Sequence, residues 1–597
     1  MPPISRRSFL RAGGALAAAA AVAPRLGWSK AASSPAGAGT TLASTIVKGA
    51  QIGSGSSGAY FRLAEGPGEP HLTRTELALR ADATARRRSL LHFVHLTDTH
   101  LCDAQSPARV EFLDRYSDPG IGCESLPFDA AFRAHETMSV QVLEAMNRRI
   151  RSVGRSPISR APIAFAICTG DNVDNEQFNE LRWFIDMMDG RKIVTPNSGG
   201  PTYEGVQLAE WVNEEYWHPD AGVPDKYKRA YGFPDYTGLL TEAIKPLTAT
   251  GIGMPWYQTF GNHDGLMQGN APQDPALEAI ATGPLKVTGA PPGLDPCDSF
   301  EILRANPSAL FGGPAFPVTA DANRRIVSRA EYIEEHFRTT GTPAGHGFTA
   351  ANRAAGTAYY TIDDHPGFRL ISLDTVNPGG YADGSIGTGQ FEWLLERLAE
   401  AHGTYLDQSG AEVQTGNPDK LVILFSHHGL RSLNNPLVTP DPLDLGSWDF
   451  PRVMADDIEA ALHRFPNVIA WVDGHTHNNI VEPRPGGTGG FWDIGTSAHC
   501  DWNCQSRLIE VVDNGDGTLS ILCTMIDHAA PAVPGGSDPV LKLASIHREL
   551  SANDFQRGFY RGAGAGELQD RNVELVIRAP FAASSRTRPA HAGAHSG

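Results

Sequence analysis

Residues 91–100 read Leu-His-Phe-Val-His-Leu-Thr-Asp-Thr-His, a short and mostly apolar run that ends in Asp98 and His100. A run of this length, stopped by polar residues, is typical of a buried strand. Side chains two positions apart on an extended chain point to the same side, so the carboxylate and the imidazole leave the strand together. In open α/β sheets, ligand sites form at the carboxyl ends of the strands. The stretch therefore predicts a strand that delivers two functional groups to such a site.

Four further patterns follow strand-like runs in the same way. They are Gly170-Asp171-Asn172-Val173-Asp174, Gly261-Asn262-His263-Asp264, Ser426-His427-His428 and Gly474-His475-Thr476-His477. One such pattern is weak evidence, but five at successive strand ends indicate one shared site. Carboxylate, imidazole and amide oxygen together form a ligand set that suits Zn, Mn or Fe, and the thiolates of a structural zinc site are missing from it.

Short apolar runs alternate with helical patterns from about residue 90 onward. The expected strands are residues 91–96, 163–168, 256–260, 368–373, 421–425 and 468–472. Helices are expected at residues 132–150, after Asp174 and Asn175 as possible N-caps, after Thr388, and at residues 455–465. The alternation predicts an α/β fold, and uninterrupted apolar strands indicate sheets covered on both faces. A hairpin is expected over residues 507–525, around Asn514-Gly515-Asp516-Gly517.

Two long stretches, residues 190–251 and 265–356, do not follow this alternation and are rich in Gly, Pro, Asn and Trp. We interpret them as loop insertions in a single domain over residues 86–530. An arm over residues 32–85 precedes this domain, and a partly disordered C-terminal segment over residues 531–597 follows it. The aromatic residues of the first insertion either line a substrate pocket or form a small core of their own; they are Trp211, Trp217, Tyr227 and Tyr231.

Residues 1–31 are interpreted as an export signal. The paired Arg6 and Arg7 precede an alanine-rich run over residues 12–23, and small residues lie near Ala31. Paired arginines before a short apolar segment indicate the twin-arginine route, whose machinery is the expected partner. The run is too short for a stable membrane span. We expect an exported protein that is periplasmic, attached to the cell wall or secreted.

The composition narrows the range of functions. The chain of 597 residues has a net charge of −17, which disfavours a general nucleic-acid-binding surface because such surfaces are basic. Hydrophobic residues make up 41% of the chain, enough for a large core. Of the seven cysteines, Cys168 is expected to be a buried thiol. Cys500 could pair with Cys504, and Cys102 with Cys123, but spacing does not determine the pairing.

The order D-x-H, G-D-x-x-D, G-N-H-D, H and G-H-x-H resembles the calcineurin-like metallophosphoesterase superfamily. The resemblance covers about residues 91–525 and implies a four-layer α/β/β/α sandwich that binds two metal ions. It implies Asp98, His100, Asp171 and His477 as ligands of the first ion. It implies Asp171, Asn262, His427 and His475 as ligands of the second, so that Asp171 bridges. His263 would contact the phosphate and assist the leaving oxygen, and Asp264 would orient His263.

Two positions qualify this resemblance. Purple acid phosphatases have glycine where His100 stands and a tyrosine ligand where Asp174 stands, so we expect no iron-tyrosinate centre. Ser426-His427-His428 offers two imidazoles for one ligand position. We favour His427 as the ligand and place His428 near the substrate.

The resemblance implies hydrolysis of a phosphate monoester or diester by a hydroxide that bridges the two ions. Metal coordination lowers the pKa of water from 15.7 towards about 7, which makes such a nucleophile available at neutral pH. Two other functions remain. The first is a non-catalytic binding protein of the same fold, although every ligand position is filled. The second is a metal-dependent amidohydrolase, although such enzymes usually carry H-x-H near the first strand of a (β/α)₈ barrel.

Overall fold

The computed structural model describes residues 39–80, 86–118, 126–211, 213–438, 449–562 and 564–581, all within one unit that spans Gly37–Gly597. The predicted signal at residues 1–31 lies outside these residues. In the described part of the chain, no helix is long and apolar enough to cross a membrane. Within the expected N-terminal arm, β1 (Ser44–Ser54) and β2 (Ala59–Pro67) form an antiparallel hairpin.

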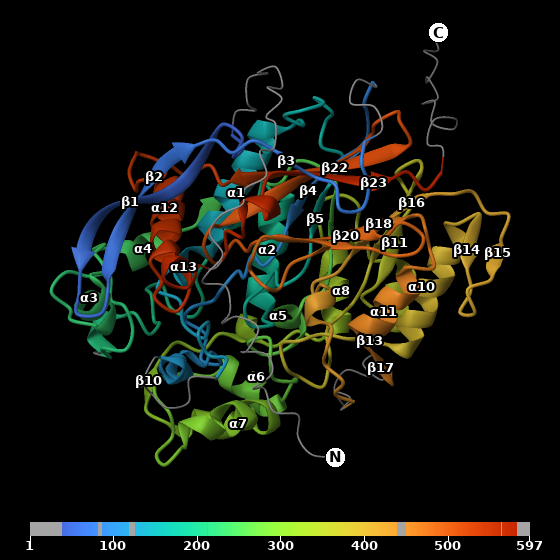
Figure 1. The fold of residues 1–597 in the computed structure, drawn as a ribbon. Coiled ribbons are helices and arrows are strands. Elements are labelled where there is room, and N and C mark those ends of the chain that lie inside the picture. Colours follow the sequence, from blue (N-terminus) through green and yellow to red (C-terminus); the bar gives the residue numbers. More distant parts are fainter. Residues whose placement is uncertain are drawn as a thin grey trace, which may run out of the picture. The chain divides into compact units, whose positions relative to one another are not determined.

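Two large β-sheets organise the described chain (Figure 1). The first has seven strands in the order β3-β23-β22-β21-β4-β5-β8. Their bounds are β3 Leu72–Arg74, β4 Arg88–Leu96, β5 Ala166–Cys168, β8 Trp256–Gln258, β21 Gln505–Asp513, β22 Thr518–Asp527 and β23 Val573–Arg578. Within this sheet β4, β5 and β8 are parallel, so their carboxyl ends lie on the same side of the sheet.

The second sheet has six strands in the order β11-β12-β16-β18-β20-β19. Their bounds are β11 Tyr360–Ile362, β12 Phe368–Ser372, β16 Leu421–Phe425, β18 Val468–Asp473, β19 Ile480–Arg484 and β20 Phe491–Gly495. The central strands β12, β16, β18 and β20 are parallel. All six expected strands are therefore present, and the expected hairpin is formed by β21 and β22.

Strand β16 shows why the parallel strands are apolar throughout. Leu421, Ile423 and Phe425 belong to a core shared by both sheets, in which Phe425 meets Phe93 edge to face at 5.6 Å between ring centroids. The alternate residues Val422 and Leu424 belong to a second cluster, with Leu394 and Leu398 of helix α10 (Thr388–Glu400) and Ile458 of α11 (Ala455–Leu462). Each such buried side chain contributes roughly 1.5–3 kcal/mol. Alternate side chains of β16 therefore pack into two different cores, so that both faces of the strand are buried.

Helix α2 (Phe178–Asp189) has the expected apolar stripe, because Leu181, Ile185 and Met188 are buried. Its N-cap is Gln177 and not Asp174 or Asn175. Asp174 is unavailable as a cap because its carboxylate lies against His100. Helix α1 covers Ser139–Val153 and begins later than expected, after the 3₁₀ turn Glu136–Met138.

The two insertions contain regular structure. The first includes β6 (Ile193–Val194), α3 (Lys226–Tyr231), α4 (Leu239–Ala243) and β7 (Leu247–Thr248). The second includes α6 (Pro275–Ala281), β9 (Leu285–Val287), α7 (Ser299–Ala305), β10 (Ala315–Pro317), α8 (Arg329–Phe337) and α9 (Ala350–Ala355). Trp217 and Tyr227 are buried in a cluster that Trp211 and Tyr231 pack against. These aromatic residues therefore belong to a buried core.

The segment after residue 530 contributes to the fold. It forms α12 (Pro539–Ala552), the short α13 (Gly558–Arg561) and β23, which pairs with β22 in the first sheet. Residues 582–597, the end of the tail that we expected to be partly disordered, lie outside the described residues. Of the cysteines, Cys297 is disulfide-bonded. Cys102, Cys168, Cys500, Cys504 and Cys523 are free thiols, so neither pairing considered from the sequence forms.

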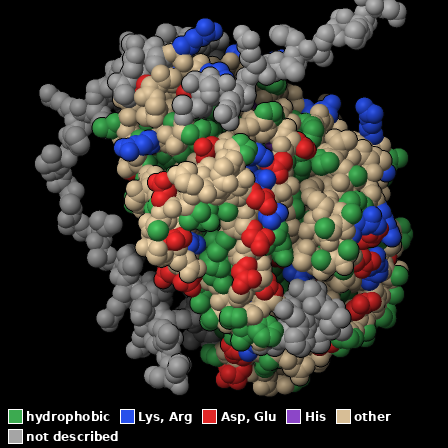
Figure 2. Space-filling view, turned by 90° about the vertical axis from the view of Figure 1, so that its right-hand side faces the viewer, with side chains coloured by type: hydrophobic (Ala, Val, Ile, Leu, Met, Phe, Trp, Pro, Cys, Tyr) green, Lys and Arg blue, Asp and Glu red, His purple; other side chains and the backbone are tan. Residues whose placement is uncertain are grey.

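Charges of opposite sign lie side by side on the face that includes α10 (Figure 2). Arg397 pairs with Glu400 at 2.9 Å, and Lys420 pairs with Asp363 at 2.8 Å. The described residues of this face form a mixed surface of paired charges and not a broad basic one.

The buried imidazole of His402 makes the stability of this fold depend on pH. Its Nε2 accepts a hydrogen bond from the Asn467 amide at 3.0 Å, and burial lowers its pKa to about 4. The unfolded chain takes up this proton near pH 6.5, so stability falls as the pH drops from 6.5 towards 4. Between pH 7 and pH 4 the wild type should lose about 3 kcal/mol more free energy of unfolding than His402→Gln. Urea unfolding of both proteins measures this difference, and equal losses would contradict it.

Candidate metal centre

The predicted ligands lie at the carboxyl ends of five strands, six of them on loops and Asn262 in the first turn of the short helix α5 (Asn262–Gly265). Asp98 and His100 follow β4, Asp171 follows β5, Asn262 follows β8, His427 follows β16, and His475 and His477 follow β18. Five of these residues have the left-handed backbone conformation that non-glycine residues rarely adopt, with φ of 50° at Asp98, 40° at His100, 49° at Asp171, 66° at His475 and 56° at His477. Strain of this kind concentrates at functional sites.

The carboxylates and imidazoles converge. His477 Nε2 lies 3.2 Å from Asp98 Oδ1, and His427 Nε2 lies 3.1 Å from Asp171 Oδ2. His100 Nε2 lies 3.6 Å from Asp171 Oδ2. Ligand atoms of Asp98, Asp171 and His427 all lie within 4.8 Å of one another, a spacing that one cation could bridge. The segments expected to share a site therefore lie close together.

Four buried polar atoms of this group have no hydrogen-bond partner among the described residues. They are Asp98 Oδ1, His100 Nε2, Asn262 Oδ1 and His427 Nε2. The other polar atom of Asn262 is held, because its amide donates to Gly269 O at 3.1 Å. Likewise, His427 Nδ1 lies 2.8 Å from Thr169 O. A buried unpartnered polar atom is costly, and a metal ion would satisfy all four. The donor set therefore fits metal ions.

Two buried carboxylates support the imidazoles nearest Asp98. His100 Nδ1 lies 3.1 Å from Asp174 Oδ1, and His477 Nδ1 lies 2.5 Å from Asp501 Oδ2. Arg109 in turn pairs with Asp174, and Arg133 pairs with Asp501 at 2.9 Å. Such a carboxylate fixes the ring and makes its free nitrogen more basic. Sequence reasoning missed the role of Asp501, because nothing in the local pattern links it to His477.

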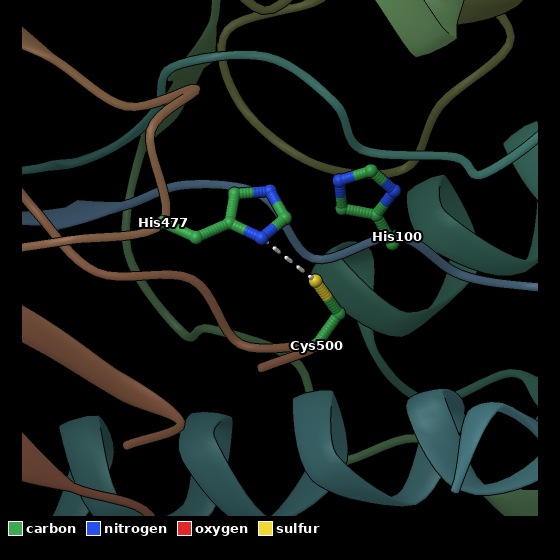
Figure 3. Close-up of side chains that lie close together, drawn as sticks. All are labelled: His100, His477 and Cys500. Carbon is green, nitrogen blue, oxygen red and sulfur yellow. Dashed lines mark hydrogen bonds between the residues drawn. The ribbon is translucent and has the colours of Figure 1, made fainter. Parts of the chain in front are cut away.

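A thiol also lies beside these rings. Cys500 Sγ is 3.8 Å from His477 Nδ1 and lies close to His100 (Figure 3). His477 Nδ1 already faces Asp501, so the thiol packs behind the ring and away from its Nε2. Burial and the neighbouring Asp501 raise the pKa of Cys500, which keeps the thiol protonated.

The structure distinguishes the adjacent histidines of the fourth motif. Both ring nitrogens of His428 have protein partners, Thr375 Oγ1 at 2.9 Å and Ala382 O at 2.7 Å. His427 instead keeps Nε2 without a hydrogen bond, directed at Asp171. His427 is therefore the residue with a nitrogen available to a metal.

The expected partnership of Asp264 with His263 is not present. His263 Nδ1 lies 2.6 Å from the main-chain carbonyl oxygen of Asp174. Asp264 instead accepts hydrogen bonds from the main-chain amides of Gly261 at 2.9 Å and Asn172 at 3.0 Å. The reason is geometric: Asp264 lies in the first turn after Gly261, where a carboxylate satisfies free main-chain amides. Asp264 ties the loop of Asn262 to the loop of Asp171.

His475 is the most exposed of the predicted ligands. Its main-chain amide donates to Asp98 Oδ2 at 3.0 Å, and its ring lies 5.1 Å from that of His427 between centroids. The side chain is 14% exposed, and its Nε2 lies 3.9 Å from Asp383. His475 therefore marks the open side of the cluster.

Burial and the charges of neighbouring groups together set the pKa values in the cluster. Burial alone would raise the pKa of Asp98, but the imidazoles of His477 and His427 outweigh it and hold this pKa below its usual range. Burial would likewise lower the pKa of His427, yet Asp171 raises it to about 9. For His263, burial prevails over Asp171 and lowers the pKa to about 4. The carboxylates that draw protons onto His427 would attract metal cations equally.

Two motif glycines are required by close packing. A Cβ at Gly261 would collide with the main-chain nitrogen and carboxylate of Asp171. A Cβ at Gly474 would collide with Thr97 Oγ1. Glycine at these positions lets the ligand loops approach one another.

Comparisons with known proteins add the following. Residues 3–23 match the model of the TAT (twin-arginine translocation) pathway signal sequence, so the chain carries an export signal of this type. No curated protein matches the chain in sequence. Similar solved structures include a dimetal phosphatase from Danio rerio, at 10% identity and a TM-score of 0.28, covering 74% of this chain and 100% of that one. They also include a purple acid phosphatase from yellow lupin (Lupinus luteus), at 11% identity and a TM-score of 0.27, covering 77% of this chain and 54% of that one.

Proposed function

We propose that this exported protein hydrolyses a phosphate ester at a centre of two metal ions. The observation that carries the proposal is the convergence of four buried, unpartnered ligand atoms from three of the five strand ends, those that follow β4, β8 and β16. A mixed set of carboxylate, imidazole and amide ligands is typical of hydrolytic Zn, Mn or Fe centres.

The ligands divide into two sets that share Asp171. Asp98, His100 and His477 belong to the first, in which both imidazoles are supported by buried carboxylates. Asn262, His427 and His475 belong to the second, in which Asn262 is neutral and His427 is supported by a main-chain carbonyl group. The first set is the more anionic, so we expect it to hold its ion more tightly.

Two bound ions would supply a water molecule of lowered pKa and offset the negative charge of the phosphoryl oxygens. The chain supplies the geometry and the proton donor. Since Asp174 O faces His263 Nδ1 at 2.6 Å, Nδ1 carries a proton. No described residue is hydrogen-bonded to His263 Nε2, which leaves that atom for the substrate. Because burial lowers the pKa of His263 to about 4, Nε2 can donate only after the ring takes up a second proton, which the negative charge of a bound phosphate favours. The protonated ring then assists the leaving oxygen as its bond to phosphorus breaks.

The alternatives are less well supported. A binding protein without catalysis has no need of His263, a histidine beside the ligands whose Nε2 has no hydrogen-bond partner among the described residues. A metal-dependent amidohydrolase would carry its ligands on a closed (β/α)₈ barrel, whereas these loops extend from two open sheets.

The test is hydrolysis by protein reconstituted with Mn, Fe or Zn. Bis(4-nitrophenyl) phosphate and 4-nitrophenyl phosphate distinguish a diesterase from a monoesterase, and a 4-nitrophenyl acyl ester serves as the control. Turnover of a phosphate ester that chelation abolishes and metal restores supports the proposal. Metal-loaded protein that cleaves neither phosphate ester contradicts it.

The support of His477 by Asp501 gives a separate prediction. Asp501→Asn keeps the size of the side chain but removes the charge 2.5 Å from His477 Nδ1. Metal affinity should fall by about 10–100-fold at one of the two ions. Titration with metal followed by calorimetry measures this, with Asp456→Asn, at an exposed position of α11, as the matched control. Unchanged affinity would mean that Asp501 has only a structural role.

A further inference from the structure

A cavity of about 350 Å³ lies on the other side of His477 from Asp98. Its walls come from four parts of the chain: Asp129, the loop Thr476–Asn478, the loop with Asp501 and Trp502, and C-terminal residues between Gln556 and Arg561 together with Gly564. One imidazole ring separates the metal centre from this cavity, because His477 directs Nε2 at Asp98 and Nδ1 at Asp501.

Hydrogen bonds join the C-terminal wall of the cavity to the loop that carries His475 and His477. The Gly564 amide donates to Asn478 Oδ1 at 2.5 Å, and the Asn479 amide donates to Gly564 O at 3.0 Å. Arg557 Nη1 donates to Asp501 Oδ2 at 3.0 Å. These contacts fix the wall before any ligand arrives, which lowers the entropy cost of binding.

The lining of the cavity contains two guanidinium groups, Arg557 and Arg561, and two carboxylates, Asp129 and Asp501. The charge of Asp501 is already balanced by Arg133, whose Nε lies 2.9 Å from Asp501 Oδ1. Arg557 pairs with both Asp501, at 3.0 Å, and Asp129, at 3.5 Å. Arg561 is exposed and forms no ion pair with any residue that the structure describes. A guanidinium group in this position suits a carboxylate or phosphate, to which it can donate two hydrogen bonds.

The walls also offer polar atoms that the protein leaves unused. Thr476 Oγ1 and Arg557 Nε are buried and have no hydrogen-bond partner among the described residues. Trp502 adds an apolar surface beside them. A ligand here would therefore meet charged and hydrogen-bonding groups as well as the indole of Trp502.

We propose that this cavity binds a second anionic group of the substrate, a phosphate or carboxylate joined by a short linker to the phosphate held at the metal centre. The inference rests on the proposed function. In this proposal the C-terminal segment, and Arg561 above all, determines which substrates bind.

The test is binding of phosphonates, which cannot be hydrolysed, to the metal-loaded protein by calorimetry. Propylphosphonate has a neutral tail, phosphonopropionate has a carboxylate tail, and propylene bisphosphonate has a second phosphonate. The wild type should bind the two doubly anionic compounds at least about tenfold more tightly than propylphosphonate. Arg561→Glu should reduce this preference to about threefold or less. Arg578→Glu, at the exposed end of β23, should retain the full preference.

The two doubly anionic compounds identify which anion the cavity prefers. Equal binding of all three compounds by the wild type, no binding of any of them, or a preference that survives Arg561→Glu would overturn the inference. Failure of the proposed function would instead appear as no hydrolysis of either chromogenic phosphate ester, an assay in which the phosphonates take no part.

Discussion

Asp171→Ala is expected to lower kcat for phosphate ester hydrolysis by at least about 10³-fold, because in the proposed centre this one carboxylate would serve both metal ions. Asp171 Oδ2 lies 3.1 Å from His427 Nε2 and 3.6 Å from His100 Nε2, so it joins the two sets of ligands. Its other oxygen, Oδ1, accepts the His263 amide at 2.8 Å. The variant should also bind fewer metal ions than the wild type.

Steady-state kinetics and elemental analysis of the same preparations measure the two effects of Asp171→Ala. Asp456→Ala, an exposed carboxylate on α11, controls for the loss of a charge. Because a loop could misfold without Asp171, circular dichroism and the unfolding midpoint accompany the measurement. A folded Asp171→Ala with full activity and a full complement of metal would refute the assignment of a two-metal centre.

His263→Ala should separate catalysis from metal binding. We expect kcat to fall by about 10²–10⁴-fold, the usual contribution of a positioned proton donor. Metal content should remain at the wild-type level, because His263 Nδ1 is occupied by Asp174 O and the residue belongs to neither ligand set. The loss should be greatest for substrates with poor leaving groups, since these depend most on protonation.

A substrate series tests this role of His263. Phenyl and 4-nitrophenyl esters of the same phosphate differ in leaving-group pKa, so their ratio of kcat in wild type and variant reports on proton donation. A loss that is equal for both esters would assign His263 to phosphate binding. Loss of metal from the variant would show that His263 is itself a ligand.

Local patterns predicted the strands and the ligand loops because each needs only a few consecutive residues. An apolar run such as residues 421–425 predicts a strand from its own composition, and the His427 that follows is placed by the strand's end. The choice between His427 and His428 needed coordinates, because it depends on Thr375 and Ala382, which are distant in sequence. Nothing in the G-N-H-D motif indicates that Asp264 bonds to main-chain amides and not to His263.

The parts that sequence did not predict come from packing between distant segments. Asp501 supports His477 only because the loop after β20 folds beneath the metal-binding loop. Arg557 reaches Asp501 because α12 returns the chain to the same place, with Leu543 and Leu550 buried in the same cluster as Tyr60. No short motif encodes such contacts.

The order of the strands in the first sheet has a consequence for the timing of assembly. Strand β4, which delivers Asp98 and His100, pairs with β21, and β21 is made more than 400 residues later. A nascent chain that ends before residue 468 lacks both His475 and His477 and has an unpaired edge along β4. The centre can therefore form only near the end of synthesis. A chain of this kind must finish folding before a twin-arginine route that carries folded proteins can export it.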